Sequence, residues 1–202
     1  MTRTTVFLLA VCLTGSLALG DVTLTIPDEE RSIPVTQDNF SLIATFLNTG
    51  SSVPLVGYDV AITITPVDPN MAGKLTITGV GTGANRAGNP VLVGSDPSFY
   101  TATEGGKALY AISDFLTSGS GSIINNSALA KILFRAEVGA KGIFNVDWYL
   151  KSGSAYRSVL YQDTSETPVS LTFDGGQISF VPEPVTMALL GLGGLALLRR
   201  RR

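Results

Sequence analysis

Short stretches of alternating apolar and polar residues recur along most of the chain. The alternation is clearest at residues 58–64, and a period of two predicts a half-buried β-strand with its apolar phase toward a core. The inward phase there is Tyr58, Val60, Ile62 and Ile64, and the outward phase is Asp59, Thr63 and Thr65. Further strands are predicted at residues 22–26, 40–46, 74–78, 108–112, 129–138, 143–150, 156–161, 169–173 and 177–181.

Three other predicted strands carry large apolar residues in one phase. These residues are Phe40, Leu42, Ala44 and Phe46; Ile132, Phe134, Ala136 and Val138; and Phe144, Val146, Trp148 and Leu150. A slip of one residue in register would expose each whole set, so the sets are expected to fix the pairing of the strands. The common core should include Tyr58, Ile62, Phe134 and Trp148.

Turn residues punctuate the predicted strands at short intervals. Asp174, Gly175 and Gly176 predict a hairpin between the last two strands, because a primed turn needs residues that tolerate positive φ. Residues 79–106 and 117–127 have the composition of loops, with a candidate short strand at 91–93. Nine or ten short strands and no helical periodicity predict an all-β fold, an antiparallel β-sandwich.

The chain ends in a segment of different character. Its three parts are Pro182, Glu183 and Pro184; an uncharged run at residues 185–198; and Arg199, Arg200, Arg201 and Arg202. The prolines and the residues before them are restricted to extended conformations, so the tripeptide should be accessible to an enzyme. A helix of fourteen residues reaches only ~21 Å of a ~30 Å hydrocarbon core, and snorkelling arginines and local thinning can absorb the difference.

The four arginines predict a transmembrane orientation. By the positive-inside rule they hold the C-terminus in the cytoplasm and place everything before Pro182 outside. A buried helix that closes a soluble domain is the alternative, but four terminal arginines and the glycines of the run fit it poorly.

The order of tripeptide, apolar run and arginine cluster resembles the PEP-CTERM sorting signal of Gram-negative bacteria. The resemblance implies that exosortase, a membrane protease-transpeptidase, recognises Pro182, Glu183 and Pro184. It also implies cleavage near the tripeptide and transfer of the protein to the cell surface or the extracellular matrix, after a transient membrane-anchored stage.

The N-terminus has the pattern of a secretory signal peptide. Arg3 precedes an apolar core within residues 4–17, and Ala18 and Gly20 place small residues before a cleavage site at Asp21. A lipoprotein signal at Cys12 is disfavoured, because Val11 is too bulky beside that cysteine. Cleavage removes the only cysteine of the chain, so the exported protein cannot form a disulfide.

These signals divide the chain into a signal peptide at 1–20, an extracellular β-sandwich domain at 21–181 and a sorting tail at 182–202. The domain carries nine lysines and arginines against fifteen aspartates and glutamates, a net charge of −6. An acidic domain of this kind is not expected to bind nucleic acid, which needs a basic face.

The residue inventory restricts the possible chemistry. The chain has no histidine, which excludes Ser-His-Asp triads, HExxH zinc sites and histidine acid–base catalysis. The glycines of residues 79–83 lack the remainder of a phosphate-binding motif. Oxygen ligands at residues 68–70 and 163–166 do not fit an EF-hand, so neither a metal nor a cofactor is predicted. A pair of carboxylates such as Glu137 and Asp147 stays open as a glycosidase pair.

A second resemblance covers most of the predicted domain. The strand at residues 55–62, the strand at 129–138 with its turn at 139–142, and the closing strand at 175–179 are similar in pattern to elements of cohesin-type domains. Cohesins are jelly-roll sandwiches that bind dockerin modules in cellulose-degrading assemblies, so the resemblance implies that fold. It assigns no binding residues to this chain.

Three functions from different classes remain. The first is a non-enzymatic exported surface or matrix protein that acts in adhesion or assembly. The second is a binding module for an extracellular polysaccharide or a surface protein, and an exposed row of aromatic side chains would favour it. The third is a carboxylate-dependent hydrolase of extracellular polysaccharide, which would need two carboxylates ~5–10 Å apart.

Overall fold

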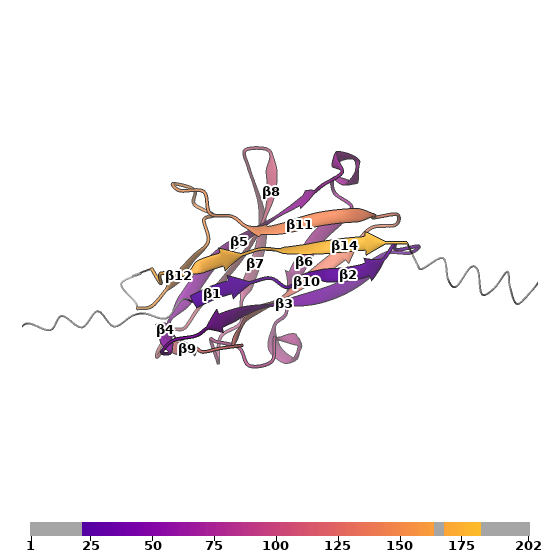
Figure 1. The fold of residues 1–202 in the computed structure, drawn as a ribbon. Coiled ribbons are helices and arrows are strands. Elements are labelled where there is room, and N and C mark those ends of the chain that lie inside the picture. The colour runs from indigo at the N-terminus through magenta and orange to yellow at the C-terminus, as the bar shows by residue number, and fades with distance from the viewer. Residues whose placement is uncertain (1–21, 164–167, 183–202) are drawn as a thin grey trace, which may run out of the picture.

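The fold is a sandwich of β-sheets, seen in a computed structural model that describes residues 22–163 and 168–182 (Figure 1). Its strands are β1 (Val22–Thr25), β2 (Glu29–Ser32), β3 (Asp38–Asn48), β4 (Val53–Leu55), β5 (Gly57–Pro66), β6 (Leu75–Val80), β7 (Ser98–Glu104), β8 (Lys107–Phe115), β9 (Gly121–Ile123), β10 (Ala128–Ala136), β11 (Gly142–Trp148), β12 (Val159–Tyr161), β13 (Thr172–Asp174) and β14 (Gly176–Val181). The described helices are two single 3-10 turns, Pro69–Met71 and Gly83–Asn85.

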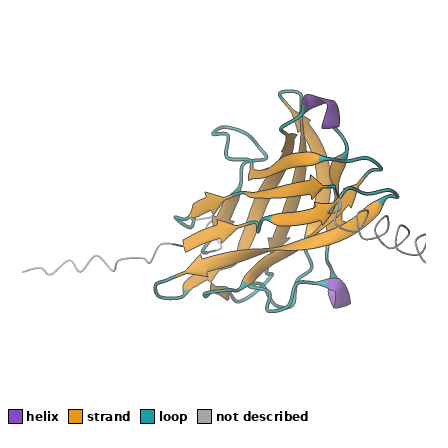
Figure 2. Ribbon diagram, turned by 45° about the vertical axis from the view of Figure 1, so that its right-hand side comes forward, coloured by secondary structure: helices purple, strands orange, loops and turns teal. Residues whose placement is uncertain are grey.

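Two sheets form the layers of the sandwich (Figure 2). The five-stranded sheet has the order β13-β1-β3-β10-β6, and the seven-stranded sheet has the order β2-β14-β11-β5-β8-β7 with β12 beside β5. A small pair, β4 and β9, lies apart from both. The predicted all-β sandwich is therefore confirmed.

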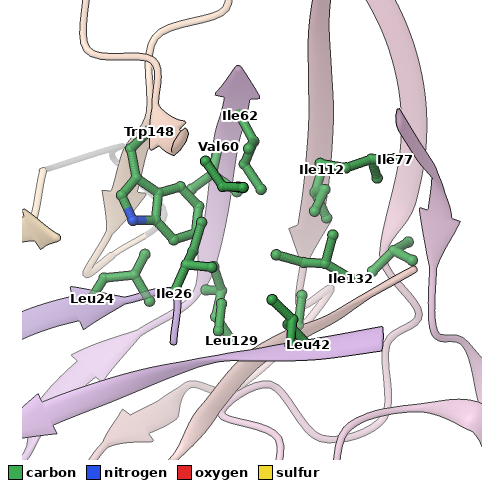
Figure 3. Close-up of a cluster of buried hydrophobic side chains, with 14 of the residues drawn as sticks. Leu24, Ile26, Leu42, Val60, Ile62, Ile77, Ile112, Leu129, Ile132 and Trp148 are labelled. Atoms are coloured by element: carbon green, nitrogen blue, oxygen red, sulfur yellow. The ribbon is translucent and has the colours of Figure 1, made fainter. Parts of the chain in front are cut away.

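The core lies between the two sheets and consists of aliphatic and aromatic side chains (Figure 3). Each strand contributes its inward phase, so the period-two pattern of the sequence becomes a buried layer. The four residues predicted to share the core, Tyr58, Ile62, Phe134 and Trp148, are all buried in one cluster. The hydroxyl of Tyr58 donates a hydrogen bond to the carbonyl oxygen of Leu129 at 3.3 Å, which satisfies the one polar group that this ring carries into the core.

Three side chains differ from the predicted phases. Val138 and Leu150 are exposed because β10 ends at Ala136 and β11 ends at Trp148, so both residues belong to the connections that follow. Thr63 was predicted to face water but is buried, because β5 is an interior strand with β11 and β8 on either side. Its hydroxyl donates to the carbonyl oxygen of Asp147 at 3.4 Å.

The hairpin predicted at Asp174, Gly175 and Gly176 is wrong, because the chain crosses there from one sheet to the other. β13 pairs with β1 in the five-stranded sheet, whereas β14 pairs with β11 in the seven-stranded sheet. A Cβ atom on Gly176 would lie 2.5 Å from the carbonyl oxygen of Ile26. Glycine is needed here for close approach of two backbones, and its φ is not positive.

The N-terminal chain makes the same crossing alongside. β1 leads into β2 as β13 leads into β14, and the pairs β1–β13 and β2–β14 are both parallel. The amide of Ile26 donates to the carbonyl oxygen of Asp174 at 3.1 Å, and the amide of Gln177 donates to Asp28 Oδ1 at 2.7 Å. The strand pairs are thus antiparallel except at these two edges, where the first two described strands pair with the last two.

Four strands escaped sequence prediction. β2 contains only charged and polar residues, and β4 and β9 are three residues long, so none of them shows a resolvable period. β7 lies in the segment 79–106 that was predicted to be a loop. The candidate strand at residues 91–93 is absent from the described elements, although Val91 and Leu92 are buried in the core.

Several predicted features fall outside the described residues. These are the signal peptide at 1–20, with Ala18, Gly20 and Asp21 at its cleavage site, and the tail beyond Pro182, with its run at 185–198 and its four arginines. Within residues 22–163 and 168–182, no helix has the length and apolar character needed to cross a membrane.

Candidate binding face and sorting tail

The sorting tail begins directly at the end of the sheet. Val181 is the last residue of β14 and pairs with Ser32 of β2, and the amide of Ile33 donates to the Val181 carbonyl oxygen at 3.0 Å. Pro182 follows immediately and is exposed. The other predicted sorting residues, Glu183, Pro184 and Arg199 to Arg202, lie beyond the described part of the chain.

The structure does not bring together the carboxylates considered for hydrolysis. Glu137 follows β10 of the five-stranded sheet, where it forms an ion pair with Arg135 at 3.2 Å and accepts a hydrogen bond from Gln37. Asp147 lies on β11 of the seven-stranded sheet, opposite Thr63. The two carboxylates therefore belong to different layers of the sandwich.

Of the loop oxygens considered for calcium, those at residues 68–70 serve a local turn, and residues 164–166 lie outside the described residues. Asp68 Oδ1 accepts hydrogen bonds from both the backbone amide and the side-chain amide of Asn70, each at 2.9 Å. This arrangement caps the 3-10 turn Pro69–Met71. Across residues 22–163 and 168–182, no three acidic side chains are grouped closely enough to hold a metal ion.

Aromatic side chains gather instead on the outer face of the seven-stranded sheet. Phe115 of β8 and Tyr161 of β12 pair with Gly57 of β5 from its two sides. A Cβ atom on Gly57 would lie 2.0 Å from a ring carbon of Phe115, so the ring covers the glycine. The Phe115 and Tyr161 rings consequently stack across β5, with centroids 5.5 Å apart and planes at 30°.

A second aromatic pair lies further along the same face. Tyr100 of β7 is opposite Ala111 of β8, and its ring centroid is 6.3 Å from that of Tyr156. Desolvation against its neighbours, followed by the nearby Asp59 carboxylate, raises the pKa of the Tyr100 hydroxyl. Between the two pairs lie Ser98 and Ser113, which face each other across β7 and β8. We call Tyr100, Phe115, Tyr156 and Tyr161 the aromatic face.

The loop that carries Tyr156 is held against the edge strand β7. Ser154 Oγ donates a hydrogen bond to Glu104, and Lys151 Nζ lies 2.9 Å from Glu104 Oε1. The Ser154 hydroxyl and then the Lys151 ammonium hold the pKa of Glu104 below its usual range. These contacts fix the position of Tyr156 beside Tyr100 and so give the aromatic face a defined shape.

A hollow of about 620 Å³ opens beside Phe115. It is lined by residues 93–96, Ser98 and residues 113–118, and its polar lining includes serine and threonine residues and the Asp96 carboxylate. Asp114 forms part of the wall, but its side chain is only 1 % exposed and lies 3.0 Å from the Arg86 guanidinium.

This ion pair anchors the long segment between β6 and β7. Arg86 also donates a hydrogen bond to the carbonyl oxygen of Leu92 in the same segment. One side chain therefore contacts both its own segment and Asp114 of β8. Burial raises the pKa of Asp114 above its ordinary value, although the Arg86 charge opposes that rise. The pair therefore holds one wall of the hollow in place.

Sequence reasoning included two rings of the aromatic face, Tyr156 and Tyr161, only as the ends of the strand predicted at 156–161. The signal for Phe115 lies in β8, where Ala111, Ser113 and Phe115 share the phase opposite to that of Tyr110 and Ile112. Neither β7 nor Gly57 was assigned a role, and the pairing that brings Tyr161 to Phe115 joins strands far apart in the sequence.

The fold is that of cohesin domains. A chain of a type I cohesin–dockerin complex from Clostridium thermocellum aligns with 11% identity over 80% of this chain and 99% of its own, with a TM-score of 0.55. CaCohA2 from Clostridium acetobutylicum aligns with 15% identity over 80% and 92%, with a TM-score of 0.54. A non-cellulosomal cohesin from the archaeon Archaeoglobus fulgidus aligns with 12% identity over 83% and 96%, with a TM-score of 0.50.

The tail has a separate likeness. Residues 180–202 match the family model of the PEP-CTERM protein-sorting motif, which confirms the resemblance noted in the sequence. This motif marks a protein for export, for processing at the membrane and for the cell surface. No curated protein matches the chain by sequence.

Proposed function

We propose that this protein is an exosortase-sorted surface protein whose sandwich binds a partner protein through the aromatic face. The observation that carries the proposal is the coincidence of a PEP-CTERM motif with a cohesin-like domain that exposes stacked aromatic rings on one sheet. Adhesion or matrix assembly at the cell surface is the role that such a protein would serve.

The sorting part follows from the order of the tail. The run at residues 185–198 enters the inner membrane after export, Arg199 to Arg202 stay in the cytoplasm, and the tripeptide is presented at the outer face. Removal of the signal peptide before Asp21 and of the tail near Glu183 leaves the domain at 21–181 free of both hydrophobic segments. The polypeptide then remains at the surface or in the matrix without a helix of its own.

The binding part is supported by the chemistry of the aromatic face. Aromatic residues are enriched at the centres of protein interfaces because they bury much area with few rotatable bonds. Tyr100 is 42% exposed and Phe115 is 43% exposed, although each ring is already fixed by a neighbouring ring. A pre-positioned side chain loses little conformational freedom when a partner covers it.

A carbohydrate ligand is the second candidate, and the hollow beside Phe115 favours it. Sugars stack on aromatic rings and exchange hydrogen bonds with hydroxyl and carboxylate groups. The ring of Phe115, the hydroxyl groups of Ser98 and Ser113 and the carboxylate of Asp96 offer this combination in one place. The protein partner ranks first because the aromatic face extends well beyond the hollow, to Tyr100 and Tyr156.

The test uses immobilised protein and the extracellular fraction of the producing cells. We expect the wild-type domain to retain a defined protein, and Tyr100→Ser with Phe115→Ser to lose most of it. Leu47→Ser, an exposed position on β3 of the other sheet, is the matched control and should retain it fully. If the wild-type domain retains only polysaccharide and the Tyr100→Ser, Phe115→Ser variant loses it, the aromatic face binds carbohydrate, which is the second candidate. Equal retention by all three proteins would contradict the binding proposal.

A further inference from the structure

The point at which the tail leaves the domain is fixed by hydrogen bonds. Val181 is paired with Ser32 within the sheet, and its neighbour Phe180 is paired with Gly142 of β11. The uncharged run of the tail begins at Val185. Only Pro182, Glu183 and Pro184 therefore separate a residue held in the sheet from a residue that enters lipid.

This connection is too short to hold the domain away from the membrane. Four steps between successive Cα atoms, from Val181 to Val185, span at most about 14 Å even when fully extended. The headgroup layer on one side of a bilayer takes up roughly 5–8 Å of that length. Once the run is inserted, which is part of the proposed function, the end of the sandwich around Val181 must lie at the membrane surface.

Three connections surround Val181 at that end, and backbone hydrogen bonds join them into one surface. The amide of Gly139 donates to the carbonyl oxygen of Pro34, next to the Ile33–Val181 hydrogen bond. The amide of Glu137 donates to the carbonyl oxygen of Lys74. On the other side of β14, the amide of Val67 donates to the carbonyl oxygen of Ile143.

Exposed aliphatic side chains lie on these connections or, in the case of Ile143, at the start of β11. These are Val35 (87% exposed), Val67 (62%), Val138 (53%) and Ile143 (40%). Lys74 and Lys141 lie among them, and Lys74 Nζ donates to the carbonyl oxygen of Val138 at 3.2 Å. We call these six residues the tail-side rim.

We propose that the tail-side rim rests on the outer surface of the inner membrane while the tail is inserted, with its valines in the headgroup layer. Apolar tips gain by leaving water at that depth, and lysines are favourable near anionic headgroups. The contact orients the sandwich upright, because the rim is at one end of its strands. The aromatic face then stands to the side of the membrane and stays accessible before processing.

The register of the strands places Val22, the first described residue, at the end of the sandwich opposite the tail-side rim. Val22 pairs with the last residue of β3, Asn48, whereas the first residue of β3, Asp38, pairs with Ala136 beside the rim (Figure 1). Exposed aliphatic residues at that far end, such as Val93 and Ile124, are the matched controls. They have comparable exposure and chemistry but no tether to hold them near lipid.

The experiment uses single cysteines, because Cys12 is the only natural one. In a Cys12→Ser background, Val35→Cys, Val67→Cys and Val138→Cys are labelled with an environment-sensitive nitrobenzoxadiazole, as are Val93→Cys and Ile124→Cys. The exported, tail-bearing protein is purified from a host without exosortase and reconstituted into vesicles of phosphatidylethanolamine and phosphatidylglycerol. Lipids with a nitroxide at the headgroup then report proximity by quenching.

We expect severalfold stronger quenching, with a blue-shifted emission, at the three rim positions than at the two controls. Equal quenching at both ends in protein that floats with the vesicles would overturn the rim contact and leave the proposed sorting intact. Protein that fails to float would overturn the tail insertion and, with it, the rim contact. A blue shift that appears only when exosortase is co-reconstituted would assign the rim to the enzyme and overturn the lipid contact.

Discussion

Trp148→Ala is expected to lower the free energy of unfolding by about 3–5 kcal/mol, because it removes the largest side chain of the core and leaves a cavity. The indole is only 6% exposed and packs against Phe173 with ring centroids 5.9 Å apart. Its Nε1 donates to the carbonyl oxygen of Asp174 at 3.0 Å, at the point where β13 crosses to β14. The tryptophan thus holds the crossover as well as the core.

Urea denaturation followed by circular dichroism measures this effect. Trp148→Phe keeps most of the apolar volume but removes the donor, so it should lose about 1–2 kcal/mol and serve as the graded control. A loss below about 1 kcal/mol for Trp148→Ala would place the indole at the surface and contradict the packing described above.

Arg86→Met is expected to destabilise the fold by about 3–5 kcal/mol, because it leaves the Asp114 carboxylate buried without its counter-charge. The cost arises from the unpaired charge, since methionine keeps much of the apolar stem of arginine. The double variant Arg86→Met with Asp114→Leu removes both charges and should regain most of the lost stability. A double variant as unstable as the single one would show that the pair acts mainly through packing.

The same pair predicts a dependence on pH. The pKa of Asp114 is raised in the folded protein, so its contribution to stability is greatest in acid and falls as the pH rises through the folded value. Loss of Arg86 raises that pKa further, so the destabilisation by Arg86→Met should be smaller at about pH 4 than at about pH 7. A constant difference across that range would contradict a charged Asp114.

The sandwich could be predicted because the alternation of apolar and polar residues within each long strand indicates which side chains are buried. Strands such as β5 and β10 lie in the interior of a sheet, and their apolar phases alone fill the core at Tyr58, Ile62 and Phe134. Apart from Thr63 inside β5, the errors lie at strand ends: the alternation continues to Val138 and Leu150, whereas β10 ends at Ala136 and β11 at Trp148. The alternation of apolar residues depends on one segment alone, whereas the length of a strand also depends on where its hydrogen-bonding partner ends.

The edges of the sheets could not be predicted, for a different reason. β2 is made of Glu29, Glu30, Arg31 and Ser32, and it forms a strand because β14 offers it a row of backbone partners. The Asp174–Gly176 segment has the composition of a tight turn, but Gly176 is needed for the close approach to the backbone of Ile26. In both cases the deciding contact is more than a hundred residues away.

The candidate site shows the same division. The sorting residues form a linear motif, so their order is visible in the sequence, and the family model finds the same segment. The aromatic face is assembled from β7, β8, β12 and the connection before β12, with Gly57 leaving room for the ring of Phe115. No single segment contains it, and only the pairing of the strands brings its rings together.

The central claim is that the tail is a processing signal for a surface protein, and the C-terminal mass of that protein tests it most directly. Protein is recovered separately from the membrane and from the cell surface or medium of exosortase-containing cells, and each pool is analysed by intact mass spectrometry. The account predicts that the membrane pool ends at Arg202 and that the surface pool ends near Glu183. Surface protein that still ends at Arg202 would show that the tail is a permanent anchor and would contradict the account.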